Sequence, residues 1–177
     1  MAPTETVTGT PAMFYDLTRH SSSDLMRAER IGLPITLLIL LIVFRAPLAA
    51  ALPLVLAAAA VTISSAALYV LSRWMPMSIF AQNVVSMIGL GIGVDYALLV
   101  VSRFRRELAQ GCHVPDAALR AAASAASAIL VSGIAVAIGF LALLLVHARF
   151  LHGMAFGGLI VVLATLVASL TLLPVLL

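Results

Sequence analysis

Four long stretches of this chain contain almost no charged side chains. They cover residues 48–71, 79–102, 121–146 and 151–177, and a single acid, Asp95, interrupts them. Each stretch is long enough to cross a hydrocarbon core of roughly 30 Å as a helix. Inside lipid, only helices and closed barrels satisfy every backbone hydrogen bond. The length of these stretches therefore predicts transmembrane helices.

A fifth and shorter span is predicted at residues 29–44. Its wholly apolar part, residues 31–44, would rise about 21 Å as a helix, which is short for the bilayer core. We therefore expect the charged turn that holds Arg27 and Arg30 to lie at the membrane interface. The sequence as a whole predicts an all-α membrane protein, with a five-helix transmembrane domain over residues 21–177.

Composition excludes several other classes of protein. The chain is 63% hydrophobic and only 10% charged, whereas soluble domains carry about 25% charged residues. Its ten basic residues are all arginines at span ends or in loops, so we expect contact with lipid headgroups and no nucleic-acid binding. The single cysteine, Cys112, excludes a disulfide or a cysteine metal site within one chain. We expect no metal and no cofactor.

The polar segments outside the spans are expected to be irregular. Residues 1–20 carry strand-favouring Thr6, Val7, Thr8 and Thr10, so the sequence predicts an extended segment there. Residues 21–24 offer a helix N-cap. Residues 103–119 are predicted to form the longest loop.

The distribution of arginines predicts which side of the membrane each loop faces. Loops 45–47 and 103–120 together carry five arginines, and loops 72–76 and 147–150 carry two. Cytoplasmic loops are enriched in basic residues, so the first pair is predicted to be cytoplasmic, with the N-terminus extracytoplasmic and the C-terminus cytoplasmic. We interpret four arginines as topology anchors: Arg45, Arg103, Arg105 and Arg106.

Asp95 is the candidate functional residue. It lies eight residues before Arg103, at a depth where a carboxylate costs about 2.5–3.5 kcal/mol. Removal from water favours the neutral form of a carboxyl group, so we expect Asp95 to bind and release a proton. The alternative is a neutral acid that hydrogen-bonds two helices together. Small residues beside it predict close helix packing: Gly89, Gly91, Gly93 and Ala97. We therefore expect Asp95 to face a packed helix or a narrow wet crevice.

Tyr96 follows Asp95 but points 100° away around the helix. Its phenol can donate a hydrogen bond and help to pass a proton, or it can simply fill space. Every other ionisable residue is expected at a span end or in a loop, so Asp95 would lack a charged partner in the membrane within one copy. His147 and His152 are expected at the interface.

Other membrane functions fit the sequence less well. An intramembrane aspartyl protease needs two aspartates that share a proton, and the motif here is GIGVD with no acid in any other span. A metalloprotease would need the motif HExxH. We therefore expect no enzymatic activity. A lipid- or sterol-sensing bundle remains open, although a sensor does not need a titrating acid.

Residues 89–108, GLGIGVDYALLVVSRFRREL, resemble the fourth-helix signature of the MmpL family of resistance–nodulation–division (RND) transporters. The likeness extends along most of the chain, from residues 8–34 to residues 157–177. The resemblance implies an RND-like, sterol-sensing-domain-like half-transporter in the bacterial inner membrane. It further implies export of lipids or other hydrophobic compounds driven by H⁺ as the coupling ion, with Asp95 and Tyr96 as a proton relay.

The resemblance assigns the five spans to helices two to six of the N-terminal half of a twelve-helix transporter. Residues 1–20 would then be the end of an extracytoplasmic domain. The family's second half supplies a partner Asp-Tyr pair, so we expect a second half or a second copy as partner. The alternative is a remnant that does not pump. Ser127 stands where an arginine of the family is expected.

Overall fold

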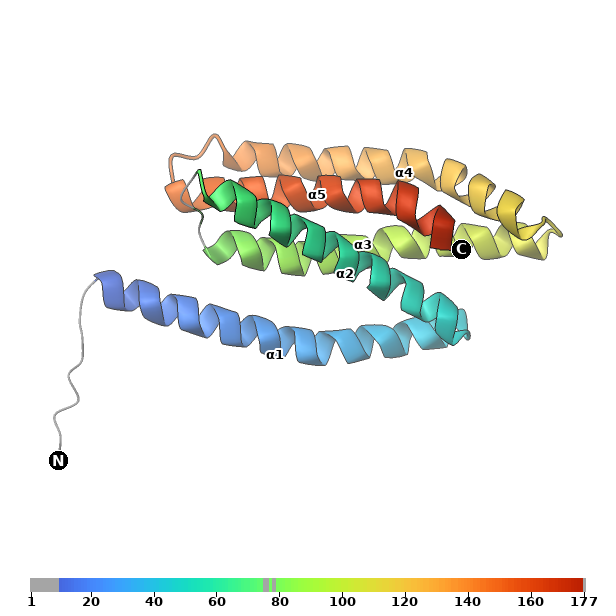
Figure 1. The fold of residues 1–177 in the computed structure, drawn as a ribbon, viewed down its shortest axis with the longest axis horizontal. Helices are drawn as coiled ribbons and strands as arrows, with labels where there is room; N and C mark the ends of the chain where they lie inside the picture. The colour runs from blue at the N-terminus through green and yellow to red at the C-terminus, as the bar shows by residue number, and fades with distance from the viewer. Residues whose placement is uncertain (1–9, 75–76, 78, 177) are drawn as a thin grey trace, which may run out of the picture.

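The structure is a computed structural model that describes residues 10–74, 77 and 79–176. Over these residues it consists of five helices and contains no strand (Figure 1). The helices are α1 (Thr10–Phe44), α2 (Pro47–Ser72), α3 (Ile79–Ala109), α4 (Val114–Leu143) and α5 (Arg149–Leu176).

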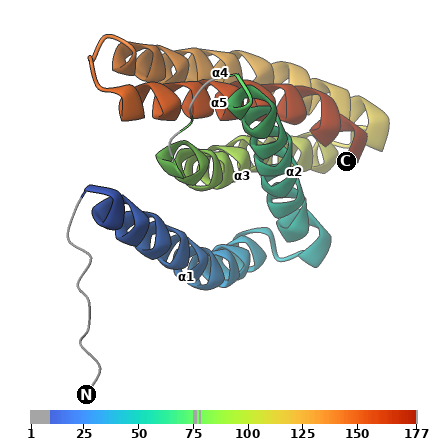
Figure 2. The same ribbon diagram turned by 60° about the vertical axis from the view of Figure 1, so that its left-hand side comes forward.

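Helices α2 to α5 form a bundle, and α1 lies beside it (Figures 1 and 2). Successive helices of the bundle run in opposite directions, whereas α1 and α3 run in the same direction. Helix α3 contacts all four other helices and α5 contacts α2, α3 and α4, so these two helices lie at the centre of the packing. Among the side chains of α1 that the structure describes, the buried ones are Leu40 and Phe44 near its C-terminal end, which are 2% and 3% exposed.

Close approach of small residues holds the centre of the bundle together. A Cβ atom added at Gly157 of α5 would lie 2.9 Å from the carbonyl oxygen of Ala81 in α3, so these two backbones pass in direct contact. The buried hydroxyls of Ser64 and Thr165 donate to carbonyls four residues earlier in their own helices. Such bonds satisfy polar groups where neither water nor another helix can do so.

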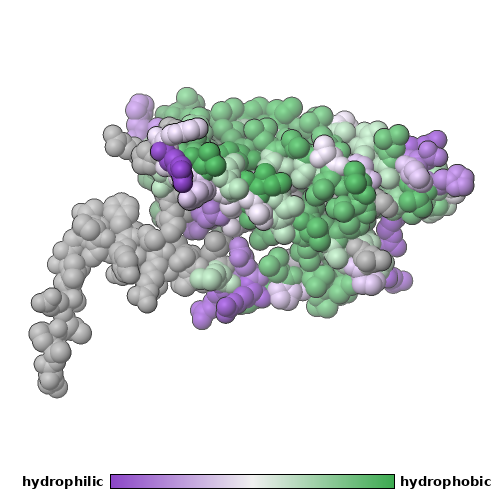
Figure 3. Space-filling view, in the orientation of Figure 1, coloured by the Kyte–Doolittle hydropathy of each residue, from purple (hydrophilic) through white to green (hydrophobic). Residues whose placement is uncertain are grey.

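Four of the helices in the described residues are long and apolar enough to cross a membrane, namely α2, α3, α4 and α5. Helix α1 is not among them, since Arg27, Glu29 and Arg30 directly precede its apolar part. The space-filling view shows hydrophobic residues over the middle of the bundle and hydrophilic residues towards its ends (Figure 3). The prediction of an all-α membrane protein is confirmed.

Helix α1 begins much earlier than the sequence predicted. The prediction of an extended segment is wrong from Thr10 onwards, because the chain is helical from there and passes through residues 21–24 without an N-cap. Residues 1–9, including the three other strand-favouring positions, lie outside the described residues. Pro11 falls in the first turn, where its missing N–H is not needed. A helix also satisfies its own backbone, whereas a lone strand would have no neighbour.

The prediction of a long loop over residues 103–119 is also wrong. Helix α3 continues to Ala109 and α4 already begins at Val114. Gly111 adopts a φ of 88°. Its N–H bonds to the Leu108 carbonyl, and the N–H of Cys112 bonds to the Glu107 carbonyl. This is the pattern of a Schellman cap, which glycine forms without strain.

Candidate functional site

A crevice of about 390 Å³ opens between α1 and α3, and one side chain of α2 contributes to its lining. Its lining is mostly apolar. Helix α1 contributes Ala28, Glu29, Gly32, Leu33 and Thr36, helix α2 contributes Leu54, and helix α3 contributes Met87, Leu90, Gly91, Val94 and Asp95.

Asp95 lies on the wall of this crevice, in the middle of α3. Its side chain is exposed in the single chain and has no hydrogen-bond or ion-pair partner among the described residues. Met87, Gly91 and Ser102 are exposed on the same face of α3. The carboxylate is therefore not a hydrogen-bonded strut between helices of this chain, and α1 covers it only across the crevice.

A second carboxylate, Glu29, lines the same crevice. Glu29 belongs to the charged turn that the sequence predicts at the membrane interface, and Asp95 was expected to lack a charged partner in the membrane within one copy. The structure brings the two acids into one space because α1 and α3 run side by side in the same direction. Glu29 lies near the start of the stretch that α1 contributes, and Asp95 lies at the end of the stretch from α3. The two carboxyl groups therefore occupy opposite ends of the crevice along the helix axes.

Tyr96 points away from Asp95, into the bundle core. It is 5% exposed, and its hydroxyl has no hydrogen-bond partner in the described structure. The same is true of the buried Ser169 hydroxyl on α5. Within this chain, therefore, the phenol and the carboxylate do not form one site. A buried hydroxyl without a partner is unusual, and it leaves Tyr96 with a free donor.

The small residues beside Asp95 do not all play the same part. A Cβ added at Gly93 would lie 2.8 Å from the Cα of Ala57, and one at Gly89 would lie 2.7 Å from a methyl of Val161. These glycines, with fully buried Ala97, face neighbouring helices. Gly91 was also predicted to pack against another helix, but it does not do so. A Cβ added there would meet no atom within 4 Å. Residues two positions apart in a helix point to nearly opposite faces, so Gly91 faces away from the helices that Gly89 and Gly93 contact.

Two of the four arginines interpreted as anchors bind other helices. The Arg105 guanidinium donates to the carbonyl of Phe44 at 2.7 Å and lies 5.8 Å from the centre of its ring. Arg103 donates to the carbonyl of Ser124 in α4. Phe44 ends α1, where carbonyls lack partners within the helix, and a basic side chain is a common cap there. Only the general need of helix ends for such donors could have suggested the Arg105 contact from the sequence, and no sequence signal pointed to the contact of Arg103 with Ser124.

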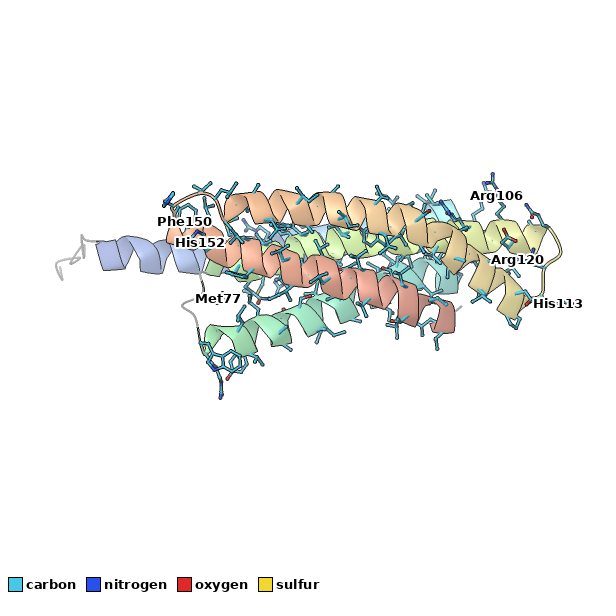
Figure 4. All side chains as sticks on the ribbon, turned by 90° about the horizontal axis from the view of Figure 1, so that it is seen from above. Met77, Arg106, His113, Arg120, Phe150 and His152 are labelled. Carbon is cyan, nitrogen blue, oxygen red and sulfur yellow. The ribbon has the colours of Figure 1, made fainter. Side chains whose placement is uncertain are left out.

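The arginines and histidines labelled in Figure 4 lie at the two ends of the molecule. Figure 4 shows Arg106, His113 and Arg120 near the α3–α4 turn, and His152 and Phe150 at the opposite end. His152 contacts the Val146 carbonyl at 3.1 Å. No cluster of residues able to hold a metal ion occurs among the described residues. The geometry thus leaves the crevice as the candidate site.

Comparison with known proteins identifies the family. The model of the MMPL family matches residues 4–177. The chain belongs to the MMPL family. It is 40% identical to a membrane protein of Streptomyces coelicolor over 97% of this chain. It is also 36% identical, over 95% of this chain, to MmpL11 of Mycobacterium tuberculosis, named a heme uptake protein, and to MmpL11 of Mycolicibacterium smegmatis, named a mycolic acid-containing lipids exporter.

The chain spans a quarter or less of these relatives. It covers 24% of the Streptomyces protein, and 17% and 18% of the two MmpL11 proteins. The predicted resemblance to the MmpL family is therefore confirmed, and the match is to a part of each longer relative.

Proposed function

We propose that this chain is part of a proton-driven transporter of lipids or other hydrophobic compounds, in which Asp95 takes up and releases the proton. The observation that carries this proposal is a carboxylate without a partner at mid-helix, in a largely apolar crevice. An ionisable group at membrane depth is rare and usually functional. The names of the MmpL11 relatives, for lipid export and heme uptake, support a hydrophobic cargo.

The proposed orientation has the start of α1 outside and the α3–α4 turn in the cytoplasm of a bacterial plasma membrane. The arginines at the inner end support it. Tyr96 would assist the relay by offering its free hydroxyl once a partner is in place. That partner would be a second transporter half or a second copy of this chain, and it would cover the exposed face of α3 that carries Asp95.

The decisive test replaces Asp95 by Asn. The exposed carboxylate makes no contact that folding needs, so abundance and melting temperature should stay close to those of the unaltered chain. Lipid efflux that depends on the proton gradient should be lost, because an amide cannot carry the proton. Asp95→Glu should retain part of the activity. Efflux is measured in cells that express each variant, with and without a protonophore.

A lipid-binding bundle that does not pump is the second candidate, favoured by the apolar lining of the crevice. It predicts that Asp95→Asn leaves lipid binding and lipid movement unchanged. Normal efflux by that variant would therefore exclude the proton relay.

A further inference from the structure

Two groups that can carry a proton line one crevice, and the space between their helices is open. The volume of about 390 Å³ leaves room for several water molecules, each of which needs roughly 30 Å³. Glu29 comes from α1 and Asp95 from α3, while the α2 contribution, Leu54, is apolar. Neither carboxylate has a partner among the described residues, and none of the basic side chains that the structure describes lines the crevice.

Glycines keep this space open along the helices. Gly32 lies three residues after Glu29, and Gly91 lies four residues before Asp95, so each is on the same helix face as its acid. Both line the crevice, and a Cβ at either would meet no atom within 4 Å. These glycines are therefore not needed for close packing, unlike Gly93. A side chain at either position would extend into the crevice that both carboxyl groups line.

Glu29 lies where α1 changes from charged to apolar residues, between exposed Arg27 and exposed Arg30. We expect that transition to lie at the water interface of the helix. The end of the crevice at Glu29 would then be in contact with water, and the end at Asp95 would lie deeper.

We propose that protons reach Asp95 from the outer face of the membrane through the crevice between α1 and α3, with Glu29 taking them up at the mouth. A proton binds the Glu29 carboxylate, passes along water beside Gly32 and Gly91, and binds the Asp95 carboxylate, which leaves Glu29 ionised again. This inference rests on the proposed function of Asp95 and on the orientation proposed with it.

The route is tested by blocking it. Gly91→Leu places a side chain in the crevice, and its Cβ meets no atom within 4 Å. Gly139→Leu on α4 is the matched control, because its Cβ also meets no atom within 4 Å. A water-soluble carbodiimide labels accessible carboxyl groups in membranes, and peptide mass spectrometry measures the labelling of Asp95. We expect Gly91→Leu to lower it at least ten-fold and Gly139→Leu to leave it unchanged. Gly32→Leu provides a second block if Gly91→Leu alters the melting temperature.

Equal labelling of Asp95 in all these variants would overturn the route but leave the proton-carrying role of Asp95 untouched. The proton-carrying role of Asp95 has its own test, because normal efflux by the Asp95→Asn variant would exclude that role. If Asp95 is not labelled even in the unaltered chain, the route is also wrong.

The entry point is tested with thiol chemistry in a Cys112→Ser background. Glu29→Cys and Arg30→Cys are each treated with a bulky thiol reagent that does not cross membranes, added outside intact cells. The adduct at position 29 should block carbodiimide labelling of Asp95, whereas the adduct at position 30 should not, since Arg30 does not line the crevice. Equal effects at both positions would exclude Glu29 as the entry. In efflux, Glu29→Gln should be several-fold slower and Glu29→Asp close to normal.

Discussion

At the scale of single residues, the glycine-rich segment before Asp95 separates two roles that look alike in the sequence. Gly89 and Gly93 allow neighbouring helices to touch, and Gly91 faces open space. The spacing predicted which residues share a face. It could not assign each face to a neighbour, since that depends on how α2 and α5 pack against α3.

Alanine substitutions at these glycines should therefore have opposite effects. Gly93→Ala would bring a methyl group to 2.8 Å from the backbone of Ala57, and such overpacking typically costs about 1–3 kcal/mol. The methyl group of Gly91→Ala would meet no atom within 4 Å, and the higher helix propensity of alanine stabilises the helix by up to about 1 kcal/mol. In detergent, the melting temperature of purified Gly93→Ala should be lower than that of the unaltered protein, and that of Gly91→Ala should be equal or higher. The reverse order would contradict the packing described for α3.

At the scale of the helices, Arg105 attaches the end of α1 to α3. Hydrogen bonds to charged groups contribute about 1.5–3 kcal/mol, and the partial exposure of this one reduces its contribution to about 1 kcal/mol. Arg105→Ala should speed amide hydrogen exchange in the last turns of α1. Arg106, which makes no such contact with described residues, is the matched control, and Arg106→Ala should leave that exchange unchanged. Equal exchange in both variants would show that Leu40 and Phe44 suffice to hold α1.

The turn between α3 and α4 gives a second prediction at this scale. Gly111 has a φ of 88° and open space around it, so a side chain there meets backbone strain but no clash. Gly111→Ala should lower stability by about 1 kcal/mol. Thermal unfolding measures the loss, and an unchanged melting temperature would argue against the Schellman cap.

The helices were more predictable than their ends. Long apolar stretches are sufficient to predict α2 to α5, because lipid leaves the backbone few alternatives. The sequence analysis misplaced the end of α3 because it took the charged residues 103–108 as a loop, although arginine, glutamate and leucine favour helices. Gly111 was the signal for where that helix ends. The Asp95 crevice was only partly predictable, since no periodicity in one helix shows that Glu29 lies across from it.

At the scale of the whole molecule, the exposed face of α3 is the surface on which a partner is predicted to dock. Met87 lies on this face and is 63% exposed, and Val131 on α4 is a control that is 70% exposed. In a Cys112→Ser background, oxidation in membranes should cross-link Met87→Cys to a second copy or to another transporter half, and the mass of the product distinguishes them. Val131→Cys should stay monomeric. Monomer alone for both variants would argue against a partner at α3.

The attachment of α1 at one end has a mechanical consequence. Arg105, Leu40 and Phe44 hold this helix near the turn to α2, while most of the apolar residues before them touch little of the bundle. A rod fixed at one end swings most at the other, so small rotations about the turn would change the width of the gap beside Glu29 far more than the spacing at Phe44. Thermal motion alone would then open and narrow the entrance, without any rearrangement of the four helices that form the bundle.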